Sequence, residues 1–539
     1  MIEISIQNSH EKFFHDAVHY EDNNYLIQTG GVFTTHRREV LDSLAKFLIR
    51  EYESKGETFV NELRGSFLIY IYDKLKEKHL IYTNHAGDKR IFYFQRQGTS
   101  IVSNSVKKIT SILKESKIKY SLDRDAAYFM LAYGYLYGNR TIISEIRLLK
   151  PGQYIRITKK QTEIQSYHKL DNTPNLRLSF QDSIEQADEL FRQAISREFE
   201  VDREYGFTPL SSLSGGLDSR MTTWVGHDMG YTDMTNFTFA QSSSPDRTIP
   251  EQIVRKLNNQ WIFHELDNGR FMTDLEEVMK ISGGEVSYLN LSHGKYAVDL
   301  LDFSDFGVLH TGQLGDVIMG SFCTTNEYGK PRYVPAISNH LIKKLPVEDL
   351  DQYDNLELML FQNRAFNSAL SGNLSIQPYT EVTSPFMDVD FFDFMMSVPL
   401  EYRIHHRIYK EWIIQKYPGA AAFKWDKLGR KITTKTVVIR GKTVSITNLP
   451  NFVIKGIKFH MNRMGSRHRG ENVGMNPFQY WYNTNETVHQ YIEQYFRENI
   501  DLLRDKEIRL DCEQIFSTGN IYEKATVISL LAVIKLYWS

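Results

Sequence analysis

The sequence predicts a mixed α/β protein in which a β-rich N-terminal part precedes a parallel sheet covered by helices. Up to about residue 170, short runs of β-forming residues are separated by turn-like segments. Beyond residue 176, strand-like and helix-like segments alternate, which is typical of a parallel sheet with helices on both faces. We therefore expect three regions, 1–170, 176–440 and 441–539, of which the last is mostly helical.

The N-terminal strands are predicted from runs of apolar and β-branched residues. "SFLIYIYD" (66–73) is followed by "HLIYTN" (79–84) and "RIFYFQ" (90–95), with turn-like residues before the last of these. We interpret the three runs as a meander. "LLKPGQYIRIT" (148–158) then places a Pro-Gly turn in front of an alternating strand.

A linker and a long helix mark the change between the first two regions. The polar, turn-rich "LDNTPN" (170–175) predicts the linker. The stretch 179–199 then repeats apolar residues at intervals of three and four, which gives a helix one apolar face. The repeating residues are Ile184, Ala187, Leu190, Phe191, Ala194 and Ile195.

The composition excludes several classes of protein. With 64 basic and 66 acidic residues the net charge is −2, so no general attraction to nucleic acid is expected. Only two cysteines occur, Cys323 and Cys512, which excludes a disulfide framework and favours a reducing, cytoplasmic location. The N-terminal residues have no basic start followed by an apolar run, so we expect no secretory signal, and no apolar run approaches the roughly 20 residues of a transmembrane helix.

The stretch "SGGLDS" (214–219) is the first chemically informative one, because it lies where a strand ends and a helix begins. We expect Gly215 and Gly216 to adopt positive φ and to let the backbone approach a ligand. The N–H groups of the new helix, with its dipole behind them, would then face a phosphate, and Ser214 and Ser219 could add hydroxyl donors. The alternative is a strand–turn–helix junction capped by serines.

Asp218 would repel a phosphate, so it makes sense there only if it holds Mg²⁺ that bridges phosphate oxygens. The stretch "RGKT" (440–443) is not a second phosphate loop. A Walker A loop needs a glycine where Thr436 stands, and we interpret "RGKT" as a turn between strands.

"SGGLDS" resembles the pyrophosphate loop of the ATP-pyrophosphatase superfamily, and most of the chain resembles the asparagine synthetase family. The resemblance implies an N-terminal-nucleophile (Ntn) αββα sandwich for 1–170, a PP-loop synthetase domain for 176–440 and a helical extension for 441–539. It also implies that ATP is cleaved between its α- and β-phosphates, that a carboxylate becomes an acyl-adenylate, and that an amine displaces AMP.

Three further stretches support the resemblance. "LHTGQLGDVIMGSF" (309–322) is similar to the family pattern Ser-Gly-Glu-Gly-x-Asp-Glu, which implies that Asp316 is the second Mg²⁺ ligand beside Asp218. Gln313 and Val317 depart from the two glutamates of this pattern. A glutamine cannot accept a proton, so the amine must be deprotonated by another group.

"SPFMDVDFFDFMMSVPLEYRI" (384–404) resembles a family segment whose aspartate, here Asp388, lies near the acyl-acceptor site. A helix N-cap is the alternative role for Asp388. "FKWDKLGR" (423–430) resembles Arg-Pro-Lys-x-Gly-Phe, which implies that Lys427 stabilises negative charge in the transition state, although an exposed surface lysine is the alternative.

The resemblance also assigns a nucleotide site at the ends of parallel strands. The residues expected to bind ATP or pyrophosphate are Leu213, Ser214, Gly215, Gly216, Leu217, Asp218, Ser219, Phe239, Thr311 and Gly312. ATP and Mg²⁺ are therefore the expected substrate and cofactor.

The stretch 59–94 resembles the glutaminase half of the family, whose first mature residue is a nucleophilic cysteine. Here position 2 is Ile, Thr29 stands at the oxyanion-hole asparagine, and Gly31 stands at the glutamine-binding glutamate. We therefore expect this domain to hydrolyse no glutamine. The nitrogen would come from ammonia, from an amine on a second substrate, or from an amine within the same substrate.

The substrate remains open at this stage. Branches without the cysteine include β-lactam and carbapenam synthetases and lasso-peptide cyclases, while "NPFQYWYNTN" (476–485) resembles relatives presumed to amidate sugar acids. A small-molecule, sugar-acid or peptide carboxylate is expected, and a homodimer is compatible with the resemblance. The basic stretch 455–469 could grip an anionic substrate, a carrier or a membrane surface, or be a solvated loop. Alternative functions are an ammonia- or glutamine-dependent asparagine synthetase and a non-catalytic binding protein.

Overall fold

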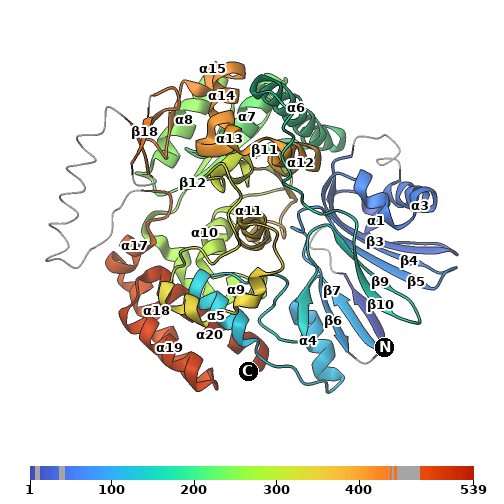
Figure 1. Ribbon diagram of the computed structural model, residues 1–539. Coiled ribbons are helices and arrows are strands. Elements are labelled where there is room, and N and C mark those ends of the chain that lie inside the picture. The colour runs from blue at the N-terminus through green and yellow to red at the C-terminus, as the bar shows by residue number, and fades with distance from the viewer. Residues whose placement is uncertain (7–11, 36–42, 97, 435, 440–441, 446–473) are drawn as a thin grey trace.

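The computed structural model confirms the mixed α/β fold, with two sheets in the N-terminal part and a parallel sheet after them (Figure 1). The description covers the chain except residues 7–11, 36–42, 97, 435, 440–441 and 446–473. The basic stretch 455–469 lies outside the described residues.

The N-terminal part contains a six-stranded sheet of order β10-β9-β5-β4-β3-β2 and a four-stranded sheet of order β1-β7-β6-β8. Neighbours are antiparallel except β1 and β7. The strands are β1 (Ile2–Ser5), β2 (Tyr20–Glu21), β3 (Tyr25–Phe33), β4 (Gly65–Asp73), β5 (Lys78–Thr83), β6 (Phe92–Arg96), β7 (Thr99–Ser103), β8 (Ile146–Leu148), β9 (Gln153–Ile157) and β10 (Thr162–Ser166). The predicted meander is wrong at its third strand, because β4 and β5 pair but β6 belongs to the other sheet.

Side-chain alternation along β4 shows how the layers form. Phe67, Ile69 and Ile71 face a core that includes helix α3 (Leu44–Lys55), whereas Leu68 and Tyr70 face the core between the two sheets. The outer face of the four-stranded sheet packs on α4 (Val106–Glu115) and α5 (Arg124–Tyr133). The result is a helix–sheet–sheet–helix sandwich, as expected for this part; α1 (His15–Val18) lies on the α3 side.

The parallel sheet has the order β13-β12-β11-β14-β15, and each neighbouring pair is parallel. Its strands are β11 (Thr208–Ser212), β12 (Thr235–Ala240), β13 (Gln260–Glu265), β14 (Phe306–His310) and β15 (Val382–Thr383). All five carboxyl ends therefore lie at one edge of the sheet.

Helix α6 (Phe180–Tyr205) is the predicted long helix, and it begins where Ser179 accepts a hydrogen bond from Asp182 N–H. Its first five turns pack with α7 (Asp218–Asp228) on one face of the parallel sheet. Its last turns enter the N-terminal core, where Val201 is buried. Helices α8 (Pro245–Leu257) and α10 (Leu289–Val298) cover other parts of the sheet.

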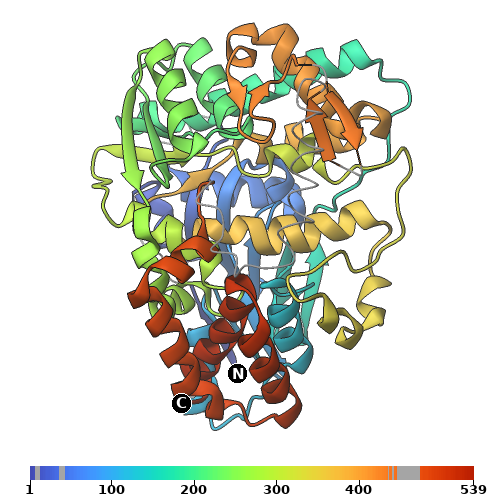
Figure 2. The ribbon, with the colours of Figure 1, turned by 90° about the vertical axis from the view of Figure 1, so that its left-hand side faces the viewer.

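From Phe478 onward the chain is helical and forms the red group at the bottom of Figure 2, whereas Lys442–Ser445 is a strand. Helix α20 packs on α5, α9, α18 and α19. The C-terminal helices are α17 (Phe478–Thr484), α18 (Glu486–Asn499), α19 (Lys506–Thr518) and α20 (Ile521–Trp538), and α9 is Leu275–Ser282. No helix in the described ranges has both the length and the apolar composition to cross a bilayer.

The chain between β14 and the C-terminal helices supplies short elements around the sheet edge. They are α11 (Leu356–Leu360), α12 (Val389–Ser397), α13 (Leu400–Arg403), α14 (Arg407–Lys416), α15 (Pro418–Ala421), β16 (Lys424–Trp425), β17 (Arg430–Lys431), β18 (Thr436–Ile439) and β19 (Lys442–Ser445). β18 and β19 pair antiparallel, and Lys442 and Thr443 of the "RGKT" stretch belong to β19, whereas residues 440–441, where the turn was predicted, lie outside the described residues.

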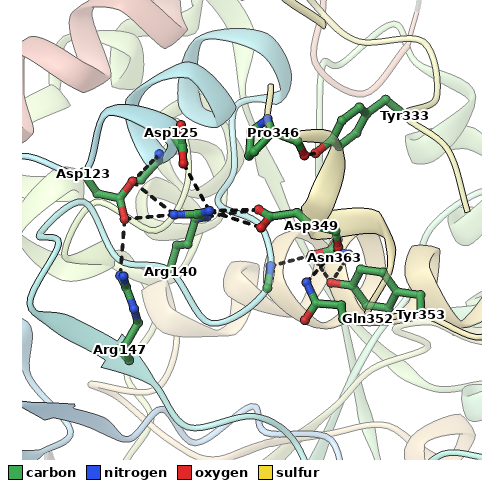
Figure 3. A network of polar contacts seen from close by, with 12 residues as sticks. Asp123, Asp125, Arg140, Arg147, Tyr333, Pro346, Asp349, Gln352, Tyr353 and Asn363 are labelled. Carbon is green, nitrogen blue, oxygen red and sulfur yellow. Dashed lines mark hydrogen bonds and ion pairs between the residues drawn. The ribbon is translucent and has the colours of Figure 1, made fainter. Parts of the chain in front are cut away.

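Polar contacts join the N-terminal part to this region (Figure 3). Arg140 forms ion pairs with Asp123 (3.2 Å) and with Asp349 (3.1 Å). The segment 170–175 is also held in place, since Asn172 is buried and its Nδ2 donates to Glu357 Oε2 over 2.8 Å. The predicted linker is therefore anchored at Asn172, while Asp171, Thr173 and Asn175 are exposed to solvent.

Candidate active site

The candidate site lies where β11 and β14 meet in the middle of the parallel sheet. β11 lies between β12 and β14 in the sheet, and β14 lies between β11 and β15. The strand order therefore changes direction between β11 and β14. Ligands of open α/β sheets bind in the crevice at such a switch point, beyond the carboxyl ends of the strands. The stretches 214–219 and 311–316 follow directly after β11 and β14. The fold thus brings together the SGGLDS loop and the loop that contains Asp316.

The SGGLDS loop is ordered by internal hydrogen bonds. Gly215 N–H donates to Asp246 Oδ1 (3.0 Å), Gly216 N–H donates to Ser214 Oγ (3.2 Å), and Ser214 N–H donates to Ser219 Oγ (2.9 Å). The expected positive φ is wrong, because neither glycine is among the described residues with φ above zero. Gly215 is favoured instead by close packing, since a Cβ there would lie 3.0 Å from the Cβ of Asp426.

Helix α7 begins next to this loop without a side-chain cap at Leu217. Helices α6 and α8, by contrast, are capped by Ser179 and Ser244. Uncapped N–H groups and the positive end of the helix dipole favour an anion at this point. Gly312 passes so close that a Cβ on it would lie 2.2 Å from Ser219 N, so the loop after β14 closes over the start of α7.

Asp218 and Asp316 are brought together at this junction. The backbone N–H of Asp316 donates to the carboxylate of Asp218, and a Cβ on Gly315 would lie 2.7 Å from Asp218 Cγ. Burial and the charge of Asp316 raise the pKa of Asp218 to about 8, although Tyr409 Oη donates to its Oδ1 over 2.7 Å. The pair is an unfavourable concentration of negative charge that a cation would relieve.

Asp316 is also held by a hydrogen-bonded chain. Ser321 Oγ donates to Asp316 Oδ2 (2.8 Å) and lies 3.3 Å from His406 Nε2. Burial, followed by the charge of Lys427, lowers the pKa of His406 to about 4, so its ring is neutral at neutral pH. Because the single proton of Ser321 goes to Asp316, His406 donates from Nε2 to Ser321 Oγ.

Left-handed backbone accumulates beside the carboxylate pair. Leu314, His405 and His406 have φ of 63°, 55° and 57°. This conformation costs an L-residue roughly 1–2 kcal/mol, and such strain clusters at functional sites. Leu314 stands where the family pattern has its second glycine, so it is a third departure from that pattern, beside Gln313 and Val317.

Arg220 ties the SGGLDS loop to the segment that contains Lys427. Its fully buried guanidinium donates to Gly215 O (3.1 Å) and to Lys424 O (2.6 Å). The exposed Lys427 is therefore held near the carboxylates. Its positive charge partly opposes the rise in the pKa of Asp218, and it contributes to the low pKa of His406.

The predicted nucleotide residues line the ends of the central strands. Leu213 is buried and its N–H donates to Phe237 O (2.8 Å), while Thr311 Oγ1 donates to Thr383 O (2.8 Å). Phe239 is partly buried at the end of β12. Gln313 follows β14 as well, and its buried Oε1 has no hydrogen-bond partner in the described chain.

The described contacts of Asp388 do not include the carboxylate pair of Asp218 and Asp316. Asp388 forms an ion pair with Arg197 (2.6 Å) and accepts the N–H of Asp390 at the start of α12 (3.1 Å). None of its described hydrogen bonds reaches Asp218 or Asp316. The N-cap alternative thus describes its contacts, and its catalytic role stays a prediction.

The N-terminal positions named by the resemblance are occupied by packed residues. Thr29 is buried and its Oγ1 donates to Ala17 O (2.9 Å). Gly31 has φ of 99°, and a Cβ there would lie 2.1 Å from Ser66 O, so no side chain fits. Both cysteines are buried elsewhere, Cys323 after β14 and Cys512 in α19, and burial raises the pKa of each thiol.

Residues 34–168 match the family model of a glutamine amidotransferase domain. The parallel sheet that follows adds a second α/β unit to this amidotransferase-like part.

Relatives match over a longer part of the chain. A putative asparagine synthetase (glutamine-hydrolyzing) 2 of Methanocaldococcus jannaschii is 24% identical over 398 residues, 71% of each chain. A probable asparagine synthetase (glutamine-hydrolyzing) of Acanthamoeba polyphaga mimivirus is 24% identical over 284 residues, which are 48% of this chain and 47% of the relative. Asparagine synthetase (glutamine-hydrolyzing) 3 of Bacillus subtilis is 27% identical over 225 residues, 39% and 35% of the two chains. These similarities support an asparagine synthetase-like family for the chain.

Two solved structures give weaker similarities. An allosteric regulatory enzyme of purine biosynthesis aligns with a TM-score of 0.21 and 9% identity, over 46% of this chain and 62% of that one. Glutamine phosphoribosylpyrophosphate amidotransferase from B. subtilis aligns with a TM-score of 0.19 and 10% identity, over 63% and 76%.

Several site residues have no clear signal in the sequence. Tyr409 and His406 come from the chain around α14, almost 200 residues after Asp218, and nothing in their spacing points to the site. Arg220 could have been predicted as a buried residue of the site, because a side chain in the first turn of a helix that follows a glycine loop has little access to solvent. Asp246, in the first turn of α8, also belongs to the site, because it accepts from Gly215 N–H of the glycine loop.

Proposed function

We propose that the protein is an ATP-dependent amide ligase that adenylates a carboxylate, releases pyrophosphate and joins the acyl group to ammonia or an amine, with release of AMP. The observation that most favours this is the meeting of Asp218 and Asp316 beneath an uncapped helix start at the switch point of the sheet. The names of the relatives, which are asparagine synthetases, support the same reaction class.

The residues present fit a divalent cation. Among the described residues no group of three or more His, Cys, Asp or Glu could hold a metal by itself. Two carboxylates suit Mg²⁺, because it commonly keeps waters and substrate phosphate oxygens as its other ligands. Asp218 and Asp316 would hold the ion, which would supply charge neutralisation at the phosphates.

The chain's own groups would then orient the nucleotide. The N–H groups at the start of α7 favour the pyrophosphate end, and the exposed Lys427 would stabilise charge that develops on phosphate and acyl oxygens. Gly215 and Gly216 have N–H groups already engaged, so the grip is assigned to the helix turn rather than to the glycines. Gln313 can orient an amine through its unpartnered Oε1 but cannot take its proton.

We further propose that the N-terminal part hydrolyses no glutamine. Thr29 offers no side-chain amide for an oxyanion, and at Gly31 there is no room for the carboxylate that would anchor the substrate. Both buried thiols lie outside this part. The part then acts as a scaffold that covers one side of the synthetase-like region.

Pyrophosphate exchange tests the proposal. The purified protein would be incubated with ATP, MgCl₂ and labelled pyrophosphate in the presence of a panel of carboxylic acids that begins with L-aspartate. At least one acid should support exchange, with AMP as product after addition of ammonium, and Asp218→Asn should lose both signals. ADP as product, or no exchange with any acid, would contradict the ligase. Glutamate release from glutamine would contradict the scaffold role alone.

A non-catalytic binding protein is the second candidate. The internal hydrogen bonds of the glycine loop and the replacement of both pattern glutamates by Gln313 and Val317 favour it. It predicts ATP binding without exchange, which the same assay combined with nucleotide-binding measurements would detect.

A further inference from the structure

A cavity of about 250 Å³ lies between the N-terminal part and the region around the parallel sheet. We call it the interface cavity; one wall comes from residues 85–86 and 150–170, the other from residues 352–366 and 387–392. It is distinct from the candidate active site, because neither Asp218 nor Asp316 is among its lining residues.

The inner wall of the interface cavity is apolar. Leu358, Phe366 and Phe392 contribute to it from α11, from the helical segment Phe361–Ser368 that continues α11, and from α12. Water in contact with such a wall is readily displaced by an apolar group, because burial of apolar surface is favourable. The wall therefore suits the hydrocarbon part of a ligand.

Two hydrogen-bond donors of the cavity, on Lys150 and Gln362, are available to a ligand. Lys150 Nζ donates to Gln352 Oε1 (2.8 Å), and no carboxylate in the described chain lies within ion-pair distance of it. Burial lowers the pKa of Lys150, so its charge is held at a cost that an anion would offset. Gln362 adds a buried Nε2 that has no hydrogen-bond partner among the described residues.

The carboxylates in or near the cavity already have basic partners: Asp349, whose charge acts on Lys150 and opposes the effect of burial, is paired with Arg140 over 3.1 Å. Asp354 is the one carboxylate among the lining residues that the structure describes, and it pairs at the rim with Lys169 (3.4 Å). Burial and the nearby His168 lower the pKa of His85 to about 3, so its ring is neutral. His168 Nε2 faces Asp393 Oδ2 over 2.9 Å and is thereby engaged.

From this arrangement we infer that the interface cavity binds an amphipathic organic anion. The hydrocarbon part would lie against Leu358, Phe366 and Phe392, and the anionic head would accept from Lys150 and Gln362. A cation is disfavoured, since the single lining carboxylate already has a lysine partner. The inference is independent of the proposed ligase activity, and the ligand would contact both parts of the chain at once.

Octanoate is the probe, and octylammonium is its control with the same chain and the opposite charge. Isothermal titration calorimetry should show saturable binding of one octanoate per chain, with octylammonium at least about tenfold weaker, because only the anion can accept the charged hydrogen bond from Lys150. Thermal unfolding should shift upward with octanoate concentration. Absence of saturable octanoate binding, or equal binding of the two probes, would overturn the inference.

Two variants locate the site. Lys150→Met should weaken octanoate binding about tenfold while it keeps the length of the side chain, and the exposed Lys160→Met is the matched control that should change nothing. Leu358→Trp should abolish binding by filling the cavity. Octanoate binding that survives both Lys150→Met and Leu358→Trp in folded protein would place the ligand elsewhere and refute the assignment.

Discussion

The two places that the resemblance marks as catalytic differ in how far their groups are satisfied. In the N-terminal part, Thr29 is hydrogen-bonded and Gly31 fits tightly against the next strand. At the switch point of the parallel sheet, Asp218 has a pKa raised to about 8, and Leu314 has a left-handed backbone. One place is packed like a structural core, whereas the other retains charge repulsion and strain.

The difference teaches where a ligand is to be expected. Unfavourable groups cost stability and persist when the surrounding structure holds them for a purpose, such as binding an ion or a substrate. A place without such groups has no need of a ligand to become stable. The comparison therefore favours a working synthetase-like site and a scaffold role for the N-terminal part.

The largest effect is expected for Asp218→Asn. Activity in pyrophosphate exchange should fall at least about 10²–10³-fold, as for loss of a main electrostatic group. The exposed Asp233→Asn is the matched control and should keep full activity. Activity retained in Asp218→Asn would remove the contrast between the two places.

The same variant should also be more stable than the parent in metal-free buffer. The folded pKa of Asp218, about 8, exceeds its usual value of 3.8, so the folded state keeps a proton that the unfolded state loses. The parent's stability should thus fall as pH rises from 4 through 8, and asparagine removes this loss. Melting temperatures with EDTA at pH 5 and pH 8 test this: the gain should be larger at pH 8.

Arg220→Gln should have the next effect, because four carbonyl oxygens would lose a donor around the glycine loop. We expect stability to fall by about 3 kcal/mol in denaturant titrations and exchange activity to fall about tenfold or more. Arg203→Gln on the exposed face of α6 is the control. Unchanged activity would show that the loop and the Lys427 segment are not coupled.

Gly31→Ala tests the packed side of the comparison. The added Cβ would meet Ser66 O at 2.1 Å, so we expect a loss of about 2–4 kcal/mol in the free energy of unfolding. Gly206→Ala also has positive φ, at 74° in the left-handed region, but open space around it, and should lose only about 1–2 kcal/mol. Similar losses in the two variants would mean that position 31 has room for a side chain.

The smallest effect is expected for His405→Gly. This exposed residue has φ of 55°, and glycine would relieve up to about 1 kcal/mol of strain. Thermal unfolding would measure the gain, and exchange activity should change little because the side chain faces solvent. A loss of stability would show that His405 makes a favourable contact that offsets its backbone strain.

Much of the fold could be predicted because periodicity is local. The apolar repeat of α6 and the strand–helix alternation of the parallel sheet were both visible in the sequence. The pairing of β6 was not, since neighbouring strands can join different sheets and only tertiary packing decides. The region boundaries at 170, 176 and 440, the cytoplasmic location and the homodimer remain predictions.

The site was predictable only where its residues are contiguous. SGGLDS and the loop with Asp316 could be named from the sequence, because each follows a strand directly. Tyr409 and the chain from Ser321 to His406 reach the same carboxylates from distant elements, and no spacing rule links them. The conformation of Gly215 was misjudged because close packing, not positive φ, explains that glycine.

Helix α6 has a consequence for how such a chain can evolve. Its last turn belongs to the N-terminal core, where Tyr205 Oη accepts the N–H of Phe14 (3.0 Å) and Val308 of β14 is also buried. Deletion of the N-terminal part would leave these surfaces of the central helix and strand open to water. Under the proposed scaffold role, individual glutaminase positions would be substituted while the part itself is retained, because natural selection on folding would continue after selection on its chemistry had ended.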